Sequence, residues 1–490
     1  MDLKINFDNS YSQLPEDFYE SVKPTQVRSP SIIRVNNRLA KELGIDLQDR
    51  DSEKLADFFS GNTVLNGSNP IAQVYAGHQF GYFSPRLGDG RSILLGEVID
   101  INGKRRDLQL KGSGVTLFSR NGDGRATLGS VIREYIVSEA MYALNIATTR
   151  SLAMVKTGEP VYRENTHPGA VLCRVASSHI RIGTFEYFSG KQDLESLKIL
   201  ADYVITRHYP NLDNNENKYL SLFESVVDIQ SQLVARWMNI GFIHGVMNTD
   251  NVLISGETMD YGPCAFMDDY NKNTVFSSID QNGRYSFNNQ KYAIEWDLAR
   301  FGESLIPLIS SNSEKSIGFI QNSLKGFQNK FDDYYYSGMN NKVGIFEDNK
   351  YDSDLIDELL TLMEKNKLDY TLFFRSLCEI VETEDFNIIK KLCKDNEIDI
   401  WLGRWFQIIK KQDINLSQIV IQMKSLNPVF IPRNHRVEEA IHHAVTENDF
   451  SFMNTLIEIL KNPYTDSLKY KEYMLPPEMK DPSYKTFCGT

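Results

Sequence analysis

HGVMNTDN (244–251), the apolar run VLI (252–254) and DYGP (260–263) follow one another near the middle of the chain and decide how the rest is interpreted. The first segment ends in a carboxylate and an amide, Asp250 and Asn251, and the third begins with another aspartate. Oxygen atoms of such side chains suit hard cations such as Mg²⁺. The apolar run between them predicts a buried strand. The stretch therefore indicates a metal and phosphate site on loops that flank a strand.

The spacing within this stretch is similar to the catalytic loop of protein kinases, where His-Arg-Asp opens an eight-residue run that ends in a metal-binding Asn. Counted in this way, His244 takes the first position and Asn251 the eighth. Val246 stands third, where a kinase has its catalytic Asp, and a carboxylate occurs at the seventh position instead, at Asp250. Asp260 begins the counterpart of the kinase Asp-Phe-Gly. The pattern predicts a kinase-like metal site with a displaced carboxylate.

A glycine-rich turn and a hairpin precede this stretch. Gly88 and Gly90 stand before two strand-like segments, residues 93–95 and 107–111, which an Asn-Gly turn joins. The N-lobe of a kinase has the same order, and there the backbone amides of the turn and a lysine at the end of the strand contact phosphate. Lys111 takes the position of that lysine. By itself, Gly-Asp-Gly-Arg is also the sequence of an ordinary turn.

Residues 127–144 carry apolar side chains at close to helical spacing, together with two carboxylates, Glu134 and Glu139. In a kinase-like lobe, a glutamate of this helix pairs with the strand lysine and holds its ammonium group toward the phosphates. We expect Glu134 to pair with Lys111. Glu139 remains the alternative, and a carboxylate that faces solvent is the simpler interpretation of either one.

An insertion that ordinary kinases lack, residues 111–125, separates the lysine from this helix and is rich in Gly, Ser and Arg. Its second Gly-Asp-Gly-Arg indicates a second turn that contacts phosphate. Two further segments, 171–175 and 179–182, have the pattern of short strands and carry Arg174 and Arg181. Guanidinium groups can bind a triphosphate as bidentate donors, although two arginines on the protein surface would give the same pattern.

The second half of the chain is mainly helical. An amphipathic helix over 218–239 leads directly into the His244 loop, as in the C-lobe of a kinase. Further helical patterns follow at 292–305, 352–395, 401–425 and 434–460. We expect an α+β, protein-kinase-like bilobal fold, with a β-rich N-lobe and a mainly helical C-lobe. The expected units are an N-terminal extension (1–65), the N-lobe (66–190), the C-lobe (191–460) and a C-terminal tail (461–490).

Composition and charge limit the class of protein. The chain has 490 residues and a formal net charge of −12, which argues against binding to nucleic acid or to an anionic membrane. A few local Arg and Lys residues can still bind a nucleotide. The acidic N-terminus lacks the features of a signal or transit peptide, and no apolar run approaches the ~18 residues of a membrane span. We expect a monomer in the cytoplasm, without nucleic-acid or membrane partners.

Several motifs together resemble the selenoprotein O family of kinase-like proteins, over most of the chain from about residue 70 to 310. HGVMNTDN followed by DYGP at this distance is a specific combination. The motifs are YAGHQFG (75–81), LGDGR (87–91), LQLKGSG (108–114), NGDGRA (121–126), IREYIVSEAM (132–141), HGVMNTDN (244–251), DYGPCAFMDDY (260–270) and RYSFNNQ (284–290).

The resemblance implies an enzyme that transfers AMP from ATP to hydroxyl side chains of proteins, with the nucleotide flipped relative to its orientation in kinases. It implies Asp250 as the proton acceptor, and Asn251 and Asp260 as ligands of Mg²⁺ or Mn²⁺. The expected partners are ATP and proteins with Ser, Thr or Tyr hydroxyl groups. The residues implied at the nucleotide site are Gly88, Gly90, Arg91, Lys111, Asp123, Gly124, Arg174, Arg181, Asp260 and, as the partner of the lysine, Glu134.

A flipped nucleotide gives a reason for the displaced carboxylate. A kinase base stands near an acceptor that attacks the γ-phosphorus, so a base at position 246 is misplaced if the α-phosphorus faces the acceptor. Asp250 can then take the hydroxyl proton. Two alternatives remain: a nucleotidyl- or phosphotransferase with another donor, such as UTP, or with a small-molecule acceptor, and a pseudokinase scaffold that binds nucleotide without chemistry. The retained Lys111, Asn251 and Asp260 weigh against the scaffold.

Cys488, third from the C-terminus, stands where some members of the family carry selenocysteine. Related bacterial proteins can have a partner cysteine in the loop after the Asp-Tyr-Gly, but residues 271–280 contain none. Cys264 is the nearest alternative. A regulatory disulfide between Cys264 and Cys488 is therefore a hypothesis, and an exposed tail thiol with another redox role is its rival.

Overall fold

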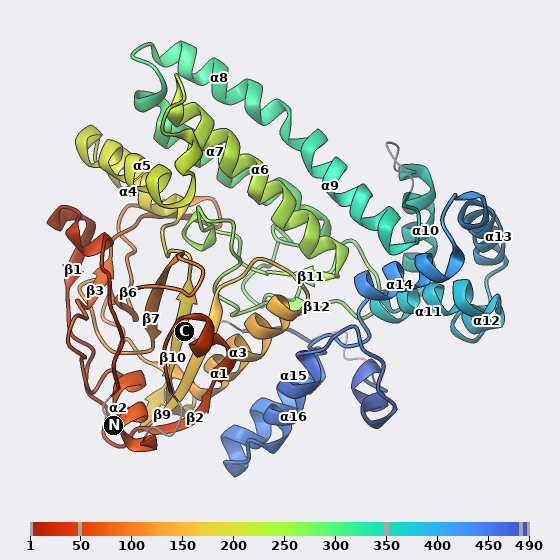
Figure 1. The fold of residues 1–490 in the computed structure, drawn as a ribbon, viewed down its shortest axis with the longest axis horizontal. Coiled ribbons are helices and arrows are strands. Elements are labelled where there is room, and N and C mark those ends of the chain that lie inside the picture. Colours follow the sequence, from red (N-terminus) through yellow and green to blue (C-terminus); the bar gives the residue numbers. More distant parts are fainter. Residues whose placement is uncertain (1–2, 48–50, 347–351, 480–483, 488–490) are drawn as a thin grey trace.

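One antiparallel sheet organises the first third of the chain (Figure 1). The computed structural model describes residues 3–47, 51–346, 352–479 and 484–487. The strands follow the order β1-β3-β6-β7-β10-β9-β2, and the short β8 pairs with β10. Their bounds are Tyr19–Ser21 (β1), Ser31–Val35 (β2), Ile71–Gln73 (β3), Ser92–Ile99 (β6), Arg105–Lys111 (β7), Ala126–Thr127 (β8), Arg150–Tyr162 (β9) and Thr166–Ala176 (β10).

The two edges of this sheet come from the N-terminal region that we expect to be an extension. β1 pairs with β3 at one edge, and β2 pairs with β9 at the other. Both pairings join residues that lie far apart in the sequence, and each strand has only three to five residues. The N-terminal region therefore completes the sheet rather than only covering it.

Side chains on the two faces of the sheet enter two separate cores. Val171, Cys173 and Val175 of β10 pack against the helices Asn37–Glu42 (α1) and Ser52–Ser60 (α2). Ala170 and Leu172 pack on the opposite face, against helix Leu128–Ala143 (α3). Because successive residues of a strand point to opposite faces, this alternation also determines where the polar residues of the strand go.

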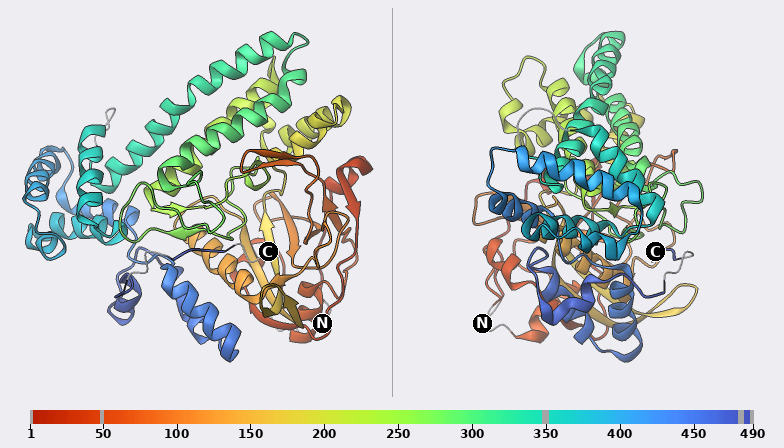
Figure 2. Two further views of the ribbon diagram at one scale, coloured as in Figure 1. Left: turned by 180° about the vertical axis from the view of Figure 1, so that it is seen from behind. Right: turned by 90° about the vertical axis from the view of Figure 1, so that its right-hand side faces the viewer.

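The second half of the chain is helical and contains the largest core. Helices α6, α7, α8 and α9 are long and run away from the sheet, and α10 to α14 lie at the far end of the molecule (Figures 1 and 2). The bounds are Ile182–Gly190 (α4), Leu194–His208 (α5), Lys218–Asn239 (α6), Gln290–Ile309 (α7), Ser313–Lys325 (α8), Phe327–Lys342 (α9), Ser353–Asn366 (α10), Tyr370–Thr383 (α11), Asn387–Leu392 (α12), Asn396–Lys411 (α13) and Leu416–Leu426 (α14).

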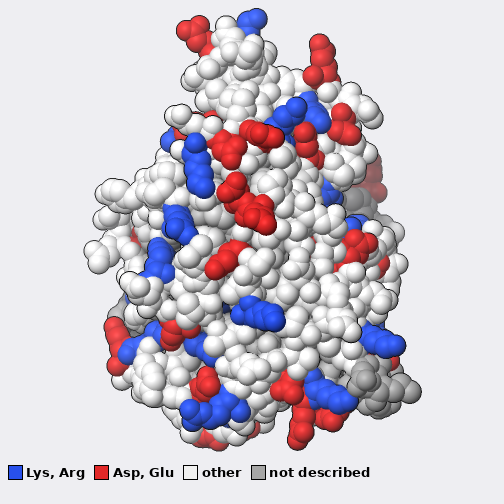
Figure 3. Space-filling model, turned by 90° about the vertical axis from the view of Figure 1, so that its left-hand side faces the viewer, with Lys and Arg blue, Asp and Glu red and all other residues white. Residues whose placement is uncertain are grey.

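The last two helices, Asn434–His442 (α15) and Ser451–Leu460 (α16), return to the sheet and pack against α3. The α+β fold with a strand-rich and a helical lobe is thus confirmed, while its specific likeness to a kinase remains a prediction. None of the described helices is both long and apolar enough to cross a membrane. Acidic and basic side chains are interspersed on the face drawn in Figure 3.

Two of the predicted strands are wrong. The run 252–254 is buried, but among the described residues it forms a single bridge, from Leu253 to Arg181. The carbonyl of Leu253 accepts hydrogen bonds from the Gln230 side chain (2.7 Å) and the Gly256 amide (3.1 Å), which prevents a longer ladder. Segment 179–182 makes that same bridge and then enters α4.

Two short hairpin-like pairs lie beside the central loop. β4 (Gly77–Gln79) pairs with β5 (Tyr82–Ser84), and β11 (Phe242–Ile243) pairs with β12 (Ala265–Phe266). The second pair brackets the segment 244–264, because its two strands enter and leave that segment side by side. Both aspartates of the central stretch are therefore held within one closed loop.

Candidate active site

Strand alternation places three polar side chains on the α3 side of the sheet. Arg174 lies directly opposite Gln109, and Leu172 lies opposite Lys111, in the pairing of β10 with β7. Cross-strand partners share a face, and Leu172 packs against α3. Gln109, Lys111 and Arg174 therefore point toward α3, and all three are buried.

Two cations and two carboxylates meet at this point. Nζ of Lys111 lies 2.5 Å from Oε2 of Glu134 and 2.7 Å from Oδ1 of Asp260. Nη1 of Arg174 donates to the same Oδ1 of Asp260 at 2.6 Å and to Oε1 of Glu134 at 3.2 Å. The formal charges of the four groups cancel, so the cluster can be buried without an unpaired charge.

Of the two candidate glutamates on α3, the structure brings Glu134 to Lys111. Glu139 points to the other side of the helix, where its carboxylate accepts hydrogen bonds from Arg150 (2.7 Å) and from Asn36 (2.7 Å). The five-residue separation turns the two side chains to different faces of one helix.

Both the backbone conformation and the ionisation state of Asp260 are constrained by its surroundings. Its φ is +59°, in the left-handed region that Asp tolerates better than most residues. Burial acts to raise the pKa of Asp260, but the charges of Arg174, Lys111 and Arg181 outweigh it and hold the pKa well below its usual range. This carboxylate is therefore ionised at neutral pH.

Asp250 has a different environment. It lies in a short 3₁₀ turn, Thr249–Asn251, and is buried. Its Oδ2 accepts one long hydrogen bond from Gln79 (3.3 Å), and its buried Oδ1 has no donor among the described residues. Burial, offset in part by Arg181, raises the pKa of Asp250 to about 6. A buried carboxylate with an unused oxygen and a pKa near neutrality suits a general base.

Asn251 and Asp260 are the two predicted metal ligands. The Nδ2 atom of Asn251 donates to the carbonyl of Val246 at 3.1 Å, which leaves the amide oxygen as the free acceptor. Oδ1 of Asp260 is held by two cations, and the side chain is 22% exposed. Two hard oxygen donors fit Mg²⁺ or Mn²⁺, which bind through one or two protein ligands together with phosphate oxygens and water.

A metal site formed by protein side chains alone is not present in the described part of the chain. No group of three or more His, Cys, Asp or Glu residues there is arranged to hold a metal ion. The donor set of Asn251 and Asp260 therefore fits a cation that arrives with a polyphosphate, and this assignment remains a prediction.

His244 supports the loop from inside. Its ring stacks on Trp237 of α6, with centroids 5.4 Å apart, and its Nε2 lies 2.8 Å from the carbonyl of Met259. Burial lowers the pKa of His244, so the ring is neutral and Nε2 carries the proton that it donates to Met259. The histidine thus ties the loop before Asp250 to the loop before Asp260.

Arg181 joins the glycine turn to the catalytic loop. Its Nη1 donates to the carbonyl of Asp250 at 3.0 Å, and its Nη2 donates to Oδ1 of Asp89 at 3.2 Å. The guanidinium carbon lies 4.1 Å from the centroid of the Tyr75 ring. These contacts hold the guanidinium of Arg181 in place. Its positive charge offsets the charge of Asp89, which is buried between Gly88 and Gly90.

The backbone amides of the glycine turn are already used within the protein. The amide of Gly88 donates to Tyr75, that of Asp89 to Gln73, and that of Gly90 to Gly88. A Cβ at Gly88 would lie 2.2 Å from Phe118 of the insertion, so the turn admits only glycine there. The predicted amide contacts of Gly88 and Gly90 with phosphate therefore require these hydrogen bonds to be shared or rearranged.

The other residues implied at the nucleotide site lie around the end of β7. The carbonyl of Arg91 accepts the amide of Gly112 at 2.8 Å, and its Nη1 is buried without a partner in the described structure. The carbonyl of Gly124 accepts the amide of Gly114 at 3.0 Å. An unpaired buried guanidinium nitrogen suits an anionic ligand.

Asp123 is the exposed member of this set. Its two carboxylate oxygens accept hydrogen bonds from Arg163 at 2.8 and 3.0 Å. The Arg163 hydrogen bond, together with the Arg125 amide and against a smaller effect of burial, lowers the pKa of Asp123. None of its described hydrogen bonds reaches Lys111 or Arg174, so its role at a nucleotide site remains a prediction.

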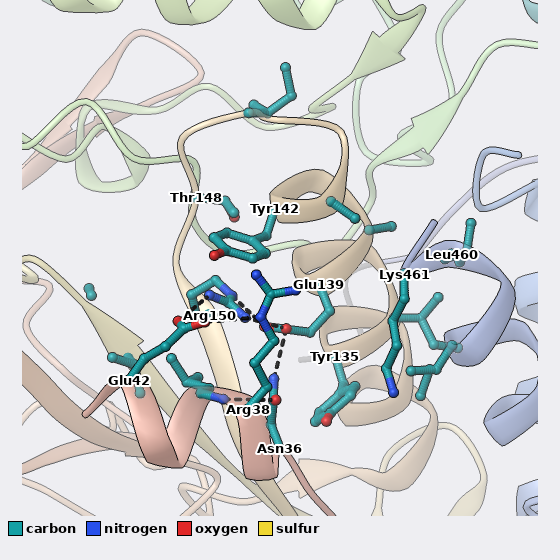
Figure 4. Close-up of a pocket in the computed structure, with 18 of the residues that line it drawn as sticks. Asn36, Arg38, Glu42, Tyr135, Glu139, Tyr142, Thr148, Arg150, Leu460 and Lys461 are labelled. Atoms are coloured by element: carbon teal, nitrogen blue, oxygen red, sulfur yellow. Dashed lines mark hydrogen bonds and ion pairs between the residues drawn. The ribbon is translucent and has the colours of Figure 1, made fainter. Parts of the chain in front are cut away.

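A cavity of about 1220 Å³ lies on the opposite side of α3. Figure 4 shows Glu139 of α3 and Arg150 of β9 pointing toward one another within it. Arg150 also stacks on the Tyr142 ring at 3.4 Å. Arg150 pairs there with Glu139 at 2.7 Å, and neither Asp250 nor Asp260 lines the cavity. We therefore assign the chemistry to the central loop and not to this space.

Several residues near the site were not predicted. Gln79 contacts Asp250, Gln109 contacts both Arg174 and Asp89, and Thr249 contacts Glu186. Gln79 belongs to the motif YAGHQFG and Gln109 to the motif LQLKGSG, so the sequence did identify the two segments that carry them. It did not identify which side chain of each segment reaches the site, because that depends on contacts between distant segments.

The C-terminal tail reaches the loop after Asp260. The hydroxyl of Thr486 donates to the carbonyl of Pro263 at 2.6 Å, and its amide donates to Phe276 at 2.8 Å. Pro263 directly precedes Cys264, which is buried. Cys488 lies outside the described residues, so the predicted disulfide with Cys264 is not tested.

Comparisons with known proteins give the family. The family model described as "Protein adenylyltransferase SelO" matches residues 2–461. The "Protein nucleotidyltransferase YdiU" of Bacillus cereus (strain G9842) is 50% identical over 485 residues, which cover 99% of this chain and 98% of the relative. That of Bacillus thuringiensis (strain Al Hakam) has the same identity and coverage. The chain therefore belongs to the protein adenylyltransferase SelO family, and it is an enzyme of the nucleotidyltransferase class.

Proposed function

We propose that this nucleotidyltransferase transfers AMP from ATP to Ser, Thr or Tyr hydroxyl groups of proteins and releases pyrophosphate. The observation that carries the proposal is the pair of unlike carboxylates: Asp260 is matched by two cations, and Asp250 is not. The first is suited to hold a fixed charge, and the second to accept a proton.

Lys111, Arg174 and Arg91 are the cations that we assign to the polyphosphate. Lys111 and Arg174 are preorganised by Glu134 and Asp260, so their positive ends are held in place before a ligand binds. The Nη1 of Arg91 is buried without a partner in the described structure and can donate to a phosphate oxygen.

Asn251 and Asp260 are the residues that would hold Mg²⁺ or Mn²⁺ with the nucleotide. When bound, the cation neutralises charge on the polyphosphate and favours the departure of pyrophosphate. The chain's own contribution is to present one amide oxygen and one carboxylate whose low pKa keeps it ionised.

In the transfer step, the acceptor hydroxyl oxygen attacks the α-phosphorus of ATP. A new oxygen–phosphorus bond forms, and the bond from the α-phosphorus to the oxygen that bridges it to the β-phosphorus breaks. The hydroxyl proton goes to the free Oδ1 of Asp250, and pyrophosphate leaves with the bond electrons. With a pKa near 6, Asp250 is mostly ionised at neutral pH and can receive this proton.

Uridylyl transfer from UTP is the second candidate. The relatives from Bacillus are named as nucleotidyltransferases, without a particular nucleotide. The cationic groups that we assign contact the polyphosphate, which ATP and UTP share, and none of them reads the base. A scaffold without chemistry is disfavoured by membership of an enzyme family.

The experiment uses the protein with MgCl₂ or MnCl₂, a soluble protein mixture, and ATP labelled at either the α- or the γ-phosphate. The proposal expects label from the α-position on protein and none from the γ-position. Label from the γ-position would mean phosphorylation and would overturn it. Unlabelled UTP in excess distinguishes the donors, because strong competition together with α-labelled UTP transfer would favour uridylylation.

A further inference from the structure

The inner strand of the β4–β5 hairpin is hydrogen-bonded to the catalytic loop. The amide of His78 donates to the hydroxyl of Thr249 at 2.7 Å, and the side chain of Gln79 donates to Oδ2 of Asp250 at 3.3 Å. Consecutive residues of the strand thus contact consecutive residues of the loop. The hairpin is positioned by the same loop that carries the proposed base.

The turn of the hairpin continues this contact. The amide of Phe80 donates to Oδ1 of Asn248 at 3.0 Å, and the hydroxyl of Tyr285 donates to the same oxygen at 2.7 Å. Tyr285 belongs to RYSFNNQ (284–290), a motif to which the proposed transfer assigns no role. Two motifs of the sequence therefore converge on the residues that precede Asp250.

A buried glutamate of α4 fixes the other end of the strand. Glu186 accepts a hydrogen bond from the hydroxyl of Thr249 and lies within hydrogen-bonding distance of Nδ1 of His78. The ring of His78 also packs on Phe83, with centroids 4.9 Å apart. The position of the hairpin relative to Asp250 is thus determined by contacts along its whole inner strand.

The outer strand presents two aromatic side chains to solvent. Tyr82 is the register partner of Gln79, and Phe83 is the register partner of His78. Tyr82 is 82% exposed and Phe83 is 44% exposed. Register partners have Cα atoms about 4.5–5.5 Å apart, so the exposed Tyr82 stands directly across from the residue that contacts Asp250.

Two arginines, Arg86 and Arg284, lie next to the hairpin, whose inner strand also contacts the carboxylates of Glu186 and Asp250. Residues 77–86 contain no Asp or Glu, and Arg86 at their end is exposed. The guanidinium of Arg284 approaches the turn, since a Cβ at Gly81 would lie 3.6 Å from its Nη1. Exposed aromatic rings next to arginines are typical of surfaces that bind protein segments.

We propose that the outer strand of the β4–β5 hairpin, with Tyr82 at its centre, binds the segment of the acceptor protein that carries the hydroxyl group. This inference rests on the proposed function. An acceptor hydroxyl must come within hydrogen-bonding distance of Oδ1 of Asp250, so its flanking residues pass next to this hairpin. Aromatic rings and arginines there favour flanking residues that are apolar or acidic and disfavour basic ones.

The test uses synthetic peptides with one central Ser, Thr or Tyr and with flanks of Leu and Glu, of Gly and Ser, or of Lys. Each is incubated with the full-length protein, MgCl₂ or MnCl₂, and ATP labelled at the α-phosphate, and KM and kcat are measured. We expect the Leu/Glu peptides to have the lowest KM and the Lys peptides the highest.

The variant is Tyr82→Ala. We expect it to raise the KM for the Leu/Glu peptides about tenfold, the effect of losing one aromatic contact of about 1.4 kcal/mol. The KM for ATP and the melting temperature should not change, because Tyr82 is 82% exposed. Tyr82→Phe, which keeps the ring, should restore the wild-type KM.

Tyr162→Ala is the matched control, since Tyr162 is also an exposed strand tyrosine, 70% accessible, at the end of β9. If Tyr82→Ala behaves like Tyr162→Ala, or if the wild type has no flank preference, the hairpin is not the acceptor site. If the wild type labels no peptide and no protein from α-labelled ATP, the proposed transfer itself fails. The two failures are therefore distinguishable.

Discussion

Asp250 and Asp260 stand ten positions apart, on either side of the buried run 252–254. Asp250 is buried, and the side chain of Asp260 is 22% exposed. Asp260 accepts hydrogen bonds from Lys111 and Arg174, and its pKa is held well below its usual range. Asp250 has one long hydrogen bond from Gln79, and its pKa is raised to about 6. The same side chain has opposite properties at the two positions.

The difference teaches which group has to change during the reaction. A ligand for a cation and polyphosphate must keep its charge throughout, and two fixed cations provide this for Asp260. A base must lose its charge when it takes a proton. This is possible for Asp250 because, among the described residues, no cation donates a hydrogen bond to its carboxylate. Experiments that test this comparison should therefore change the charge of each carboxylate or of the cations that contact it.

Asp250→Asn tests this comparison with the largest expected effect. The amide cannot accept a proton, so we expect the rate of α-label transfer to fall about 10²- to 10⁴-fold. Binding of ATP, measured by calorimetry, should change little. A variant that keeps the wild-type rate would show that Asp250 is not the base.

The same variant should be more stable than the wild type at pH 7. The folded-state pKa of Asp250, about 6, lies above the unfolded value of about 3.9. The native state therefore binds the proton more tightly, and its stability falls as the pH rises from about 4 to about 6. The uncharged amide of the Asp250→Asn variant would avoid this loss, which is at most about 3 kcal/mol, and urea unfolding would measure it.

Arg174→Met should remove one of the two cations that are hydrogen-bonded to Asp260. Removal of this guanidinium leaves Lys111 as the only cation in the described structure that donates hydrogen bonds to Glu134 and Asp260. We expect a loss of about 3–5 kcal/mol in the free energy of unfolding, measured in urea. Addition of ATP with Mg²⁺ should recover little of it.

Arg163→Met provides the control for this loss. Arg163 makes a similarly short pair with Asp123, but its side chain is 24% exposed and that of Asp123 is 42% exposed. Exposed pairs contribute about 0–1 kcal/mol. Equal losses in the two variants would mean that burial of the Asp260 cluster has no special importance.

The pH dependence of transfer sharpens the comparison further. The ionised fraction of Asp250 falls tenfold for each pH unit below its pKa of about 6, so kcat/KM should fall in the same way and level off above pH 7. Asp260 should contribute no step, since its pKa lies well below this range. A profile that is flat between pH 5 and 8 would contradict the assignment of Asp250 as the base.

Residues on periodic elements could be predicted from the sequence. Lys111 and Arg174 lie on strands whose alternation fixes their direction, and Glu134 lies on a helix whose apolar residues recur at close to helical spacing. Asp250 and Asp260 followed from spacing within one short stretch. In each case, the information is local.

The features of the fold and of the site that the sequence did not predict depend on contacts between distant segments. β1 and β2 complete the sheet through partners about 50 and 120 residues away, which no local pattern encodes. The run 252–254 has the composition of a strand, but Gln230 of α6 occupies its carbonyl. The amides of the Gly88 turn are satisfied by Tyr75 and Gln73, so a phosphate-binding sequence here has a second, structural use.

Glu139→Gln has the smallest expected effect and tests whether the two faces of α3 are independent. Glu139 binds Arg150 and Asn36 on the cavity side, whereas Glu134 binds Lys111 on the active-site side. Loss of the charge should cost about 1–2 kcal/mol of stability, because Arg150 keeps only a distant second carboxylate, Glu42, at 3.5 Å.

Transfer by the Glu139→Gln variant should stay within about twofold of the wild type, whereas Glu134→Gln should lower kcat, because it releases the ammonium group of Lys111. Measuring both properties in both variants separates folding from chemistry. If Glu139→Gln lowered kcat as much as Glu134→Gln at equal folded fraction, the charge network behind α3 would be coupled to Lys111. The large cavity would then belong to the machinery of the enzyme and not only to its framework.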